Sequence, residues 1–177
     1  MKQFVAFEGF RRIAAGAKSD VAKALRRVEG GRVFDLETGA EVDFDLRAPD
    51  ELVVSREEGE RGRGRPNLGV IAREVTLLPR HWDWLNAQRG GASAALRRLV
   101  DAARAADGGA TEAEQAKAAA YRFLSAMAGD LPHFEEVARA LFAGDLAALR
   151  ARTEDWPADV VEVALARLDG GTTSLSG

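Results

Sequence analysis

The stretch Phe4-Val-Ala-Phe-Glu-Gly-Phe-Arg-Arg-Ile-Ala-Ala15 decides the fold class, because it has the pattern of a β-hairpin. The apolar run 4–7 and the segment 10–15, which contains Phe10, Ile13 and two alanines, flank a turn at Glu8-Gly9. Glycine at the second turn position permits the positive φ that tight hairpins require. The rest of the chain is dominated by helical patterns, so the sequence predicts an α+β fold.

A helix and a second hairpin are expected after the first hairpin. Ser19 or Asp20 can cap the helix, whose apolar residues recur at helical spacing until Gly30 ends it. Strands at 33–35 and 42–46 then flank a glycine-containing turn, and the second strand alternates apolar and acidic residues. The N-terminal part is therefore predicted to have the order ββαββ.

Beyond the hairpins, composition divides the chain. Residues 55–69 have no periodic apolar face and are dense in glycine and charge, which indicates a flexible linker. The predicted organisation is an α+β unit at 1–54, the Arg/Gly linker at 55–69, a strand-helix-helix module at 70–106, a helical region at 107–169 and a disordered tail at 170–177.

The central module has a strand-like segment at 70–79, a short helix at 80–88, a Gly90-Gly91 break and a helix at 93–106. Downstream, Thr111 to Glu114 has the spacing of a capping box, in which a hydroxyl and a carboxylate satisfy amides at a helix start. The pattern after it is helical throughout.

Composition excludes several classes of site. The 177 residues include no cysteine and two histidines, which excludes disulfides, thiolate nucleophiles and zinc sites that use sulfur. No apolar run approaches the ~18 residues of a membrane span, and Glu8 interrupts any leader-like segment. We expect a soluble cytoplasmic protein without a metal or cofactor.

Charge is distributed unevenly. Between residues 61 and 104 there are nine arginines and three acidic residues, a balance of plus six. Since the net charge is −3, the rest of the chain carries minus nine. This asymmetry is typical of a polyanion-binding segment on an acidic body. Solvated helix faces in a protein that prefers arginine as its cation are the alternative explanation.

The segments Arg73-Glu-Val-Thr-Leu-Leu-Pro79, Arg80-His-Trp-Asp-Trp-Leu85 and Ser93-Ala-Ala-Leu-Arg-Arg-Leu-Val100 are similar to the ribbon-helix-helix module of bacterial repressors and antitoxins. In that family, two chains pair their strands, the ribbon enters the major groove, and the second helix grips phosphate. The resemblance implies that Thr76 faces bases and Ser93 meets the DNA backbone. It also implies an intertwined dimer core of Val75, Leu77, Trp82, Leu85, Leu96, Leu99 and Val100.

The strand departs from that family at two positions. Its outward face would present Glu74 and Leu78, where the family usually places arginine, lysine or asparagine. Glu74 would repel phosphate, and Leu78 reads no base edge except a thymine methyl. Strand-helix-helix strings of this size also occur in ordinary α+β cores.

Arg61-Gly-Arg-Gly-Arg-Pro66 resembles the core of an AT-hook. Gly64 lets the backbone lie flat in a narrow minor groove while Arg63 and Arg65 extend along its floor. A flexible charged linker is the alternative, and it is favoured by the nearby acidic residues at 57, 58 and 60.

Signs of catalysis are weak. Asp43 and Asp45, with Asp35 across from them, could hold a hard cation, but a solvated strand face explains them more simply. His81 and His133 have no nucleophile beside them in sequence, and no phosphate loop or hydrolase elbow is present. We expect no enzymatic activity.

The whole chain resembles an uncharacterised bacterial family, domain-of-unknown-function family twenty-two thirty-nine. The resemblance is carried by 4–9, 34–39, 43–46, 61–66, 68–85, 90–100 and 120–132. Because that family has no assigned activity, the resemblance implies no substrate, cofactor or mechanism.

The sequence therefore favours a homodimeric DNA-binding regulator, with the strand-helix-helix module as the binding unit and the arginine-glycine stretch as a minor-groove arm. The expected nucleic-acid contacts are Arg61, Arg63, Arg65, Arg73, Thr76, Arg80, Ser93 and Arg97. The alternative is a non-enzymatic interaction module that binds another protein through its C-terminal helices and uses the basic segment as a linker.

Overall fold

The computed structural model describes residues 2–44, 46 and 71–169. The chain forms two compact units: the first unit combines Met1–Gly59 with Glu112–Gly177, and the second unit is Glu60–Thr111. The second unit is thus inserted in the sequence of the first. The predicted linker, the arginine-glycine arm and the predicted tail lie outside the described residues.

A three-stranded antiparallel sheet is the centre of the first unit. Its strands are β1 (Phe4–Glu8), β2 (Arg11–Gly16) and β3 (Arg32–Asp35), in the order β2-β1-β3. The predicted hairpin of β1 and β2 is confirmed, and Gly9 has the positive φ of 57° that its turn requires. Because β1 lies in the middle, its residues 4–7 are all buried.

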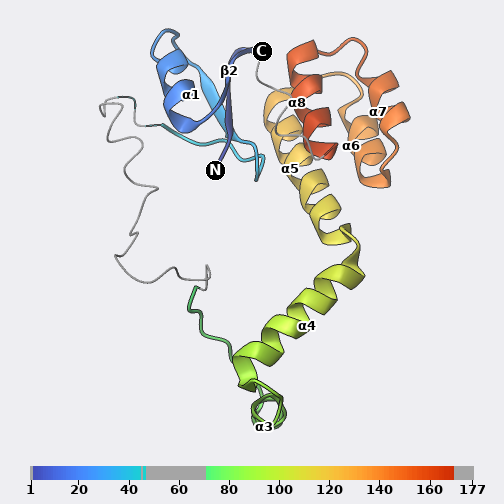
Figure 1. Ribbon diagram of the computed structural model, residues 1–177. Coiled ribbons are helices and arrows are strands. Elements are labelled where there is room, and N and C mark those ends of the chain that lie inside the picture. The colour runs from blue at the N-terminus through green and yellow to red at the C-terminus, as the bar shows by residue number, and fades with distance from the viewer. Residues whose placement is uncertain (1, 45, 47–70, 170–177) are drawn as a thin grey trace. The chain divides into compact units, whose positions relative to one another are not determined.

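Helix α1 (Lys18–Leu25) covers one face of this sheet (Figure 1). Val21, Ala22 and Leu25 of the helix join the sheet residues Phe4, Ala6 and Val33 in one buried cluster. The predicted caps Ser19 and Asp20 are wrong: the N-cap is Ala17, and no side chain accepts a hydrogen bond there. The packing of α1 on the sheet, rather than a cap, fixes where the helix lies.

The predicted fourth strand at 42–46 is wrong in the residues that the structure describes. Phe34 and Glu41 form an isolated bridge, and the amide of Val42 donates to the carbonyl of Val33 at 2.9 Å, but 42–44 form no strand. The chain leaves the sheet edge because Phe44 packs edge-on against Phe4, with ring centroids 5.2 Å apart. The N-terminal order is therefore ββαβ.

Four helices lie on the other side of the sheet from α1 (Figure 1). They are α5 (Ala110–Ala128), α6 (Phe134–Ala143), α7 (Leu146–Arg152) and α8 (Ala158–Leu168), which confirms the predicted helical region. Of these helices, α5 and α8 lie next to the sheet (Figure 1). Phe123 of α5 meets Phe7 and Phe34 of the sheet at centroid distances of 5.7 and 5.0 Å. The strands and the C-terminal helices therefore share one core.

Local chemistry at the start of α5 differs from the prediction. Thr111 lies inside the helix, so it does not act as the cap of a capping box. Instead, a carboxylate oxygen of Asp107 accepts the Thr111 amide at 2.8 Å, and the other accepts its hydroxyl at 3.0 Å. The two glycines 108 and 109, both at positive φ, separate this carboxylate from the helix that it caps.

In the second unit, two helices confirm the predicted pair: α3 (Pro79–Asn86) and α4 (Gly91–Asp107). Gly90 has a φ of 86° and makes the predicted break between them. Residues 71–78 form no strand within the described chain. A ribbon would pair this segment with a second chain, so the ribbon-helix-helix resemblance stays a prediction.

Arg32 fastens β3 to its surroundings in the first unit. Its Nε and Nη2 donate to the two carboxylate oxygens of Glu41 at 2.8 and 2.7 Å, and its Nη1 donates to the carbonyl of Ala126 at 2.9 Å. The hydrogen bond from Arg32 lowers the pKa of Glu41 despite opposition from burial, and the Arg32 charge adds to the lowering.

We expect Phe123→Ala to lower the free energy of unfolding by about 3–5 kcal/mol, because it empties the junction of sheet and helices. Denaturant unfolding followed by circular dichroism measures this loss. The matched control is Phe142→Ala, at a ring that is 49% exposed and should cost about 1 kcal/mol or less. Equal losses of unfolding free energy in the two variants would contradict the conclusion that Phe123 joins the sheet to the helices.

Glu41→Gln should remove one component of the acid dependence of stability. The pKa of Glu41 is lower in the folded chain than its ordinary value of 4.5. Glu41 therefore contributes to the free energy of unfolding above pH 4.5, and this contribution is lost as the pH falls through the pKa of the folded chain. Unfolding midpoints below that ordinary value measure the loss. The variant should show a flatter decline than wild type, and Glu29→Gln, at an exposed residue without an ion pair to any described residue, should decline as wild type does.

Candidate nucleic-acid interface

The predicted nucleic-acid contacts that the structure describes all belong to the second unit, and all are exposed. Arg73 and Thr76 lie in the segment 71–78, and Arg80 is the second residue of α3. Ser93 is the third residue of α4, and Arg97 follows one turn later. Arg61, Arg63 and Arg65 lie outside the described residues.

The arginines of this surface are not neutralised by neighbouring side chains. Arg73, Arg80 and Arg97 make no ion pair with any residue that the structure describes. Among the described residues of the first unit, Arg12 and Arg32 pair with carboxylates, whereas the exposed Arg139 and Arg152 form no ion pair either. Unpaired, exposed guanidinium groups are the form in which arginine is available for phosphate.

The start of α4 adds backbone donors to this surface. Its N-cap is Gly90, which has no side chain, so no side chain caps the first turn. The amides of Ala92 and Ser93 therefore point out of the helix start without a capping oxygen, beside the exposed Ser93 hydroxyl. Such an end combines free N–H groups with the positive end of the helix dipole, a combination that favours anions.

The residues of the predicted dimer core differ in how far they are exposed in the single chain. Leu85 is buried, and Leu77, Trp82 and Leu96 are half-buried. Val75, Leu99 and Val100 are exposed. Leu78, which the sequence placed on the outward face, is exposed, and so are Ile71 and Trp84, which were not among the predicted contacts. Trp84 was missed because an apolar residue in a helical pattern gives no sign of which partner covers it.

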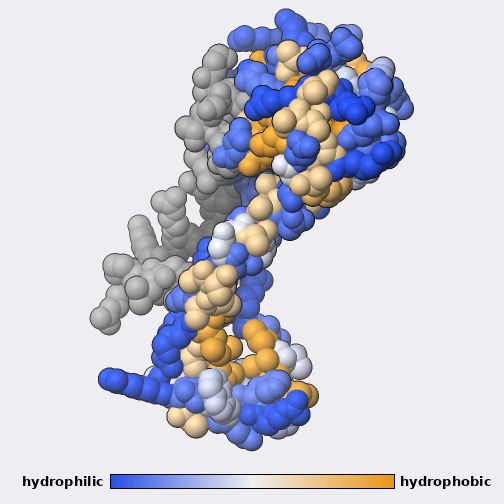
Figure 2. All heavy atoms as spheres, turned by 90° about the vertical axis from the view of Figure 1, so that its right-hand side faces the viewer, coloured by the Kyte–Doolittle hydropathy of each residue, from blue (hydrophilic) through white to orange (hydrophobic). Residues whose placement is uncertain are grey.

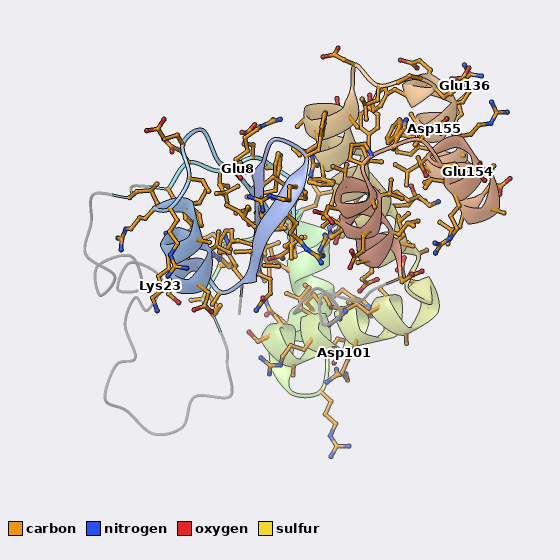
Figure 3. All side chains as sticks on the ribbon, turned by 90° about the horizontal axis from the view of Figure 1, so that it is seen from above. Glu8, Lys23, Asp101, Glu136, Glu154 and Asp155 are labelled. Atoms are coloured by element: carbon orange, nitrogen blue, oxygen red, sulfur yellow. The ribbon has the colours of Figure 1, made fainter. Side chains whose placement is uncertain are left out.

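The first unit has the opposite charge. Its C-terminal helices, residues 112–169, contain eleven acidic residues and six basic ones. Glu136 of α6 and the adjacent Glu154 and Asp155 before α8 project from this side of the unit (Figure 3). These helices would therefore repel phosphate.

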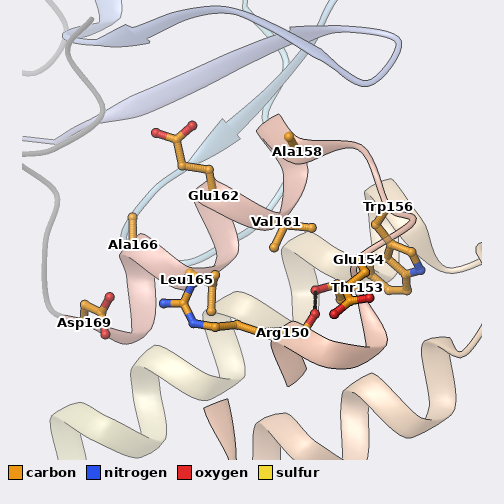
Figure 4. Close-up of a pocket in the computed structure, with 10 residues that line it drawn as sticks. All are labelled: Arg150, Thr153, Glu154, Trp156, Ala158, Val161, Glu162, Leu165, Ala166 and Asp169. Carbon is orange, nitrogen blue, oxygen red and sulfur yellow. Dashed lines mark hydrogen bonds between the residues drawn. The ribbon is translucent and has the colours of Figure 1, made fainter. Parts of the chain in front are cut away.

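A groove in the first unit is the other candidate site (Figure 4). It is open, with a volume of about 570 Å³, and it lies along α7 and α8. Val161, Leu165 and Trp156 supply apolar walls, while Arg150 and Asp169 supply charge. The Trp156 indole donates to the Pro132 carbonyl at 2.8 Å, and Glu162 pairs with Arg12, so both side chains already have structural partners.

Within the described residues, no group of three potential metal-ligating side chains occurs. Asp35, one of the three aspartates considered from sequence, accepts the amides of Glu37 and Thr38 at 2.7 and 3.1 Å and so holds a turn. Asp45 lies outside the described residues. His81 and His133 are exposed and belong to different units.

Fold and charge together define an α+β protein with an acidic sheet-and-helix unit and an inserted helical unit that presents unpaired arginines. The chain belongs to the family described as "Uncharacterized protein conserved in bacteria (DUF2239)", which it matches over residues 3–168. No curated protein and no solved structure matches it. No described helix has the length and apolar character that crossing a membrane would take.

Proposed function

We propose that the protein is a non-enzymatic, DNA-binding regulator of the bacterial cytoplasm that acts as a homodimer. The observation that supports this proposal is the concentration of exposed arginines on the second unit, at Arg73, Arg80 and Arg97, none of which forms an ion pair with a residue that the structure describes. The acidic first unit keeps the net charge negative, so the attraction is local.

The proposed mechanism is electrostatic docking followed by reading of groove shape. Each phosphate that an arginine neutralises releases counterions, which makes affinity fall steeply with salt. Ser93 and the uncapped amides of α4 would receive a phosphate oxygen, and Thr76 would face base edges. Arg63 and Arg65 would follow an A·T-rich minor groove.

A second candidate function is a protein-interaction module that uses the C-terminal helices. The groove along α7 and α8 favours it, because its apolar walls are open to a partner side chain. In that case the basic segment is a linker, and removing its arginines changes no binding.

The triple variant Arg73→Ala, Arg80→Ala, Arg97→Ala should bind DNA more weakly and with a shallower salt dependence. With each phosphate contact contributing ~0.9 to the slope of log K against log salt, the slope should fall by up to about three. Fluorescence anisotropy with A·T-rich and G·C-rich duplexes, from about 50 to 200 mM salt, measures both quantities. Arg139→Ala with Arg152→Ala, exposed arginines of α6 and α7, is the matched control. Equal effects of both variants, or no binding by wild type at low salt, would refute the proposal.

Ser93→Asp separates phosphate capture from helix stability. A carboxylate in the first turn of α4 should stabilise the helix by ~0.3–1 kcal/mol through the helix dipole, yet it should repel a phosphate at the same place. We therefore expect weaker DNA binding together with an unchanged or higher unfolding midpoint. DNA affinity equal to that of wild type would show that the start of α4 does not meet the DNA backbone.

A further inference from the structure

The second unit buries very little of itself. Among its described residues, 71–111, Leu85 and Ala95 alone are buried, at 3% and 2% exposure, where α3 crosses α4. Small units of this size depend on additional contacts, because they bury too small a share of their surface to offset the entropy of ordering the chain. The α3–α4 pair therefore needs a surface that covers it.

Its apolar side chains are on the outside instead. Ten large hydrophobic residues are exposed in the described chain, and six of them belong to this unit: Ile71, Val75, Leu78, Trp84, Leu99 and Val100. Apolar side chains of the unit are visible at its surface in Figure 2. With exposed fractions between 48% and 75%, they present on the order of 700 Å², close to the ~800 Å² per partner of a standard interface.

The backbone of 71–78 has the same need for a partner. The segment is extended (Figure 1), and no strand of the described chain pairs with it. Leu78 has the extended backbone angles φ −66° and ψ 150°. A run of unpaired N–H and C=O groups is a template for another strand. If the same segment of a second copy runs antiparallel to it about a two-fold axis, the N–H and C=O groups of both copies can form hydrogen bonds with each other. The segment is therefore complementary to itself.

We infer that a second copy of this chain covers the outward apolar surface made by Ile71, Val75, Leu78, Trp84, Leu99 and Val100. The inference rests on the proposed function, whose dimer partner and contact surface it specifies. The surface differs from the core that the ribbon-helix-helix resemblance implies, because Leu85 is already buried inside its own chain and Trp84 faces outward. Trp84 and Leu99 are therefore the side chains that associate, and Leu85 supports them from within.

The mass of the full-length protein in solution tests this inference. Light scattering behind size exclusion, at tens of micromolar protein, should give twice the 19.0 kDa of one chain. Trp84→Gln and Leu99→Glu should each give the single-chain mass, because they place polar groups in a desolvated interface. The conservative variant Leu99→Met should keep the dimer, and Phe142→Gln, at a similarly exposed ring of the first unit, should keep it as well.

Circular dichroism of each variant shows whether the helices are retained, so loss of the dimer is separable from loss of the fold. A single-chain mass for the wild type, or a dimer that survives both Trp84→Gln and Leu99→Glu, would overturn the inference. DNA binding is measured on the same samples. A wild-type dimer that these variants break but that binds no DNA supports the interface and refutes the proposed DNA binding. A single-chain wild type that binds DNA refutes the interface and the homodimer but supports the proposed DNA binding.

Discussion

The contact of three aromatic rings, Phe7 and Phe34 from the sheet and Phe123 from α5, holds the first unit together. The strands come from the first 35 residues and the helix from beyond residue 110, so the contact closes a long loop that contains the entire second unit. Such closure carries an entropic cost that grows only slowly with loop length, and burial of large aromatic side chains offsets it. The insertion of the second unit is compatible with the fold for this reason.

The same junction is secured by polar contacts around one turn. The turn after β3 brings Gly39 so close to α5 that a β-carbon there would lie 1.9 Å from the Ala119 carbonyl oxygen. Arg122 of α5 donates to the carbonyl of Thr38, and Arg167 of α8 donates to that of Glu37. Burial lowers the pKa of Arg167, although the charges of Asp35 and Glu37 oppose the shift. Two helices thereby hold a turn whose conformation glycine alone permits.

The second unit is built on a different principle from the first. The first unit buries a continuous core, and some of its charged side chains form ion pairs, such as Arg12 with Glu162. Among its described residues, 71–111, the second has two buried side chains, and its surface there combines exposed apolar side chains with exposed arginines. Burial of exposed apolar surface favours association with another chain, and exposed arginines attract polyanions. In a DNA-binding dimer, the exposed apolar side chains would form the contact between two copies and the exposed arginines would bind phosphate. In a linker, neither set of side chains would have a role.

The sequence by itself determined those features that depend on neighbouring residues. The first hairpin follows from its apolar runs and Gly9, the break between α3 and α4 from Gly90, and the end of α6 from Gly144, each at positive φ. The clustering of arginine in the central segment was likewise readable, because charge is counted along the chain. These features depend on residues close together in the chain, so the sequence of each short segment is enough to predict them.

Only the tertiary structure decided which apolar surfaces meet. It joined Phe123 to the sheet, turned Phe44 away from a fourth strand, replaced the Thr111 cap with Asp107, and distinguished the buried Leu85 from the exposed Trp84 beside it. Periodicity shows that a residue is apolar on one face of an element but not what covers that face. The partner is chosen by contacts between distant segments, which a pattern of neighbours does not contain.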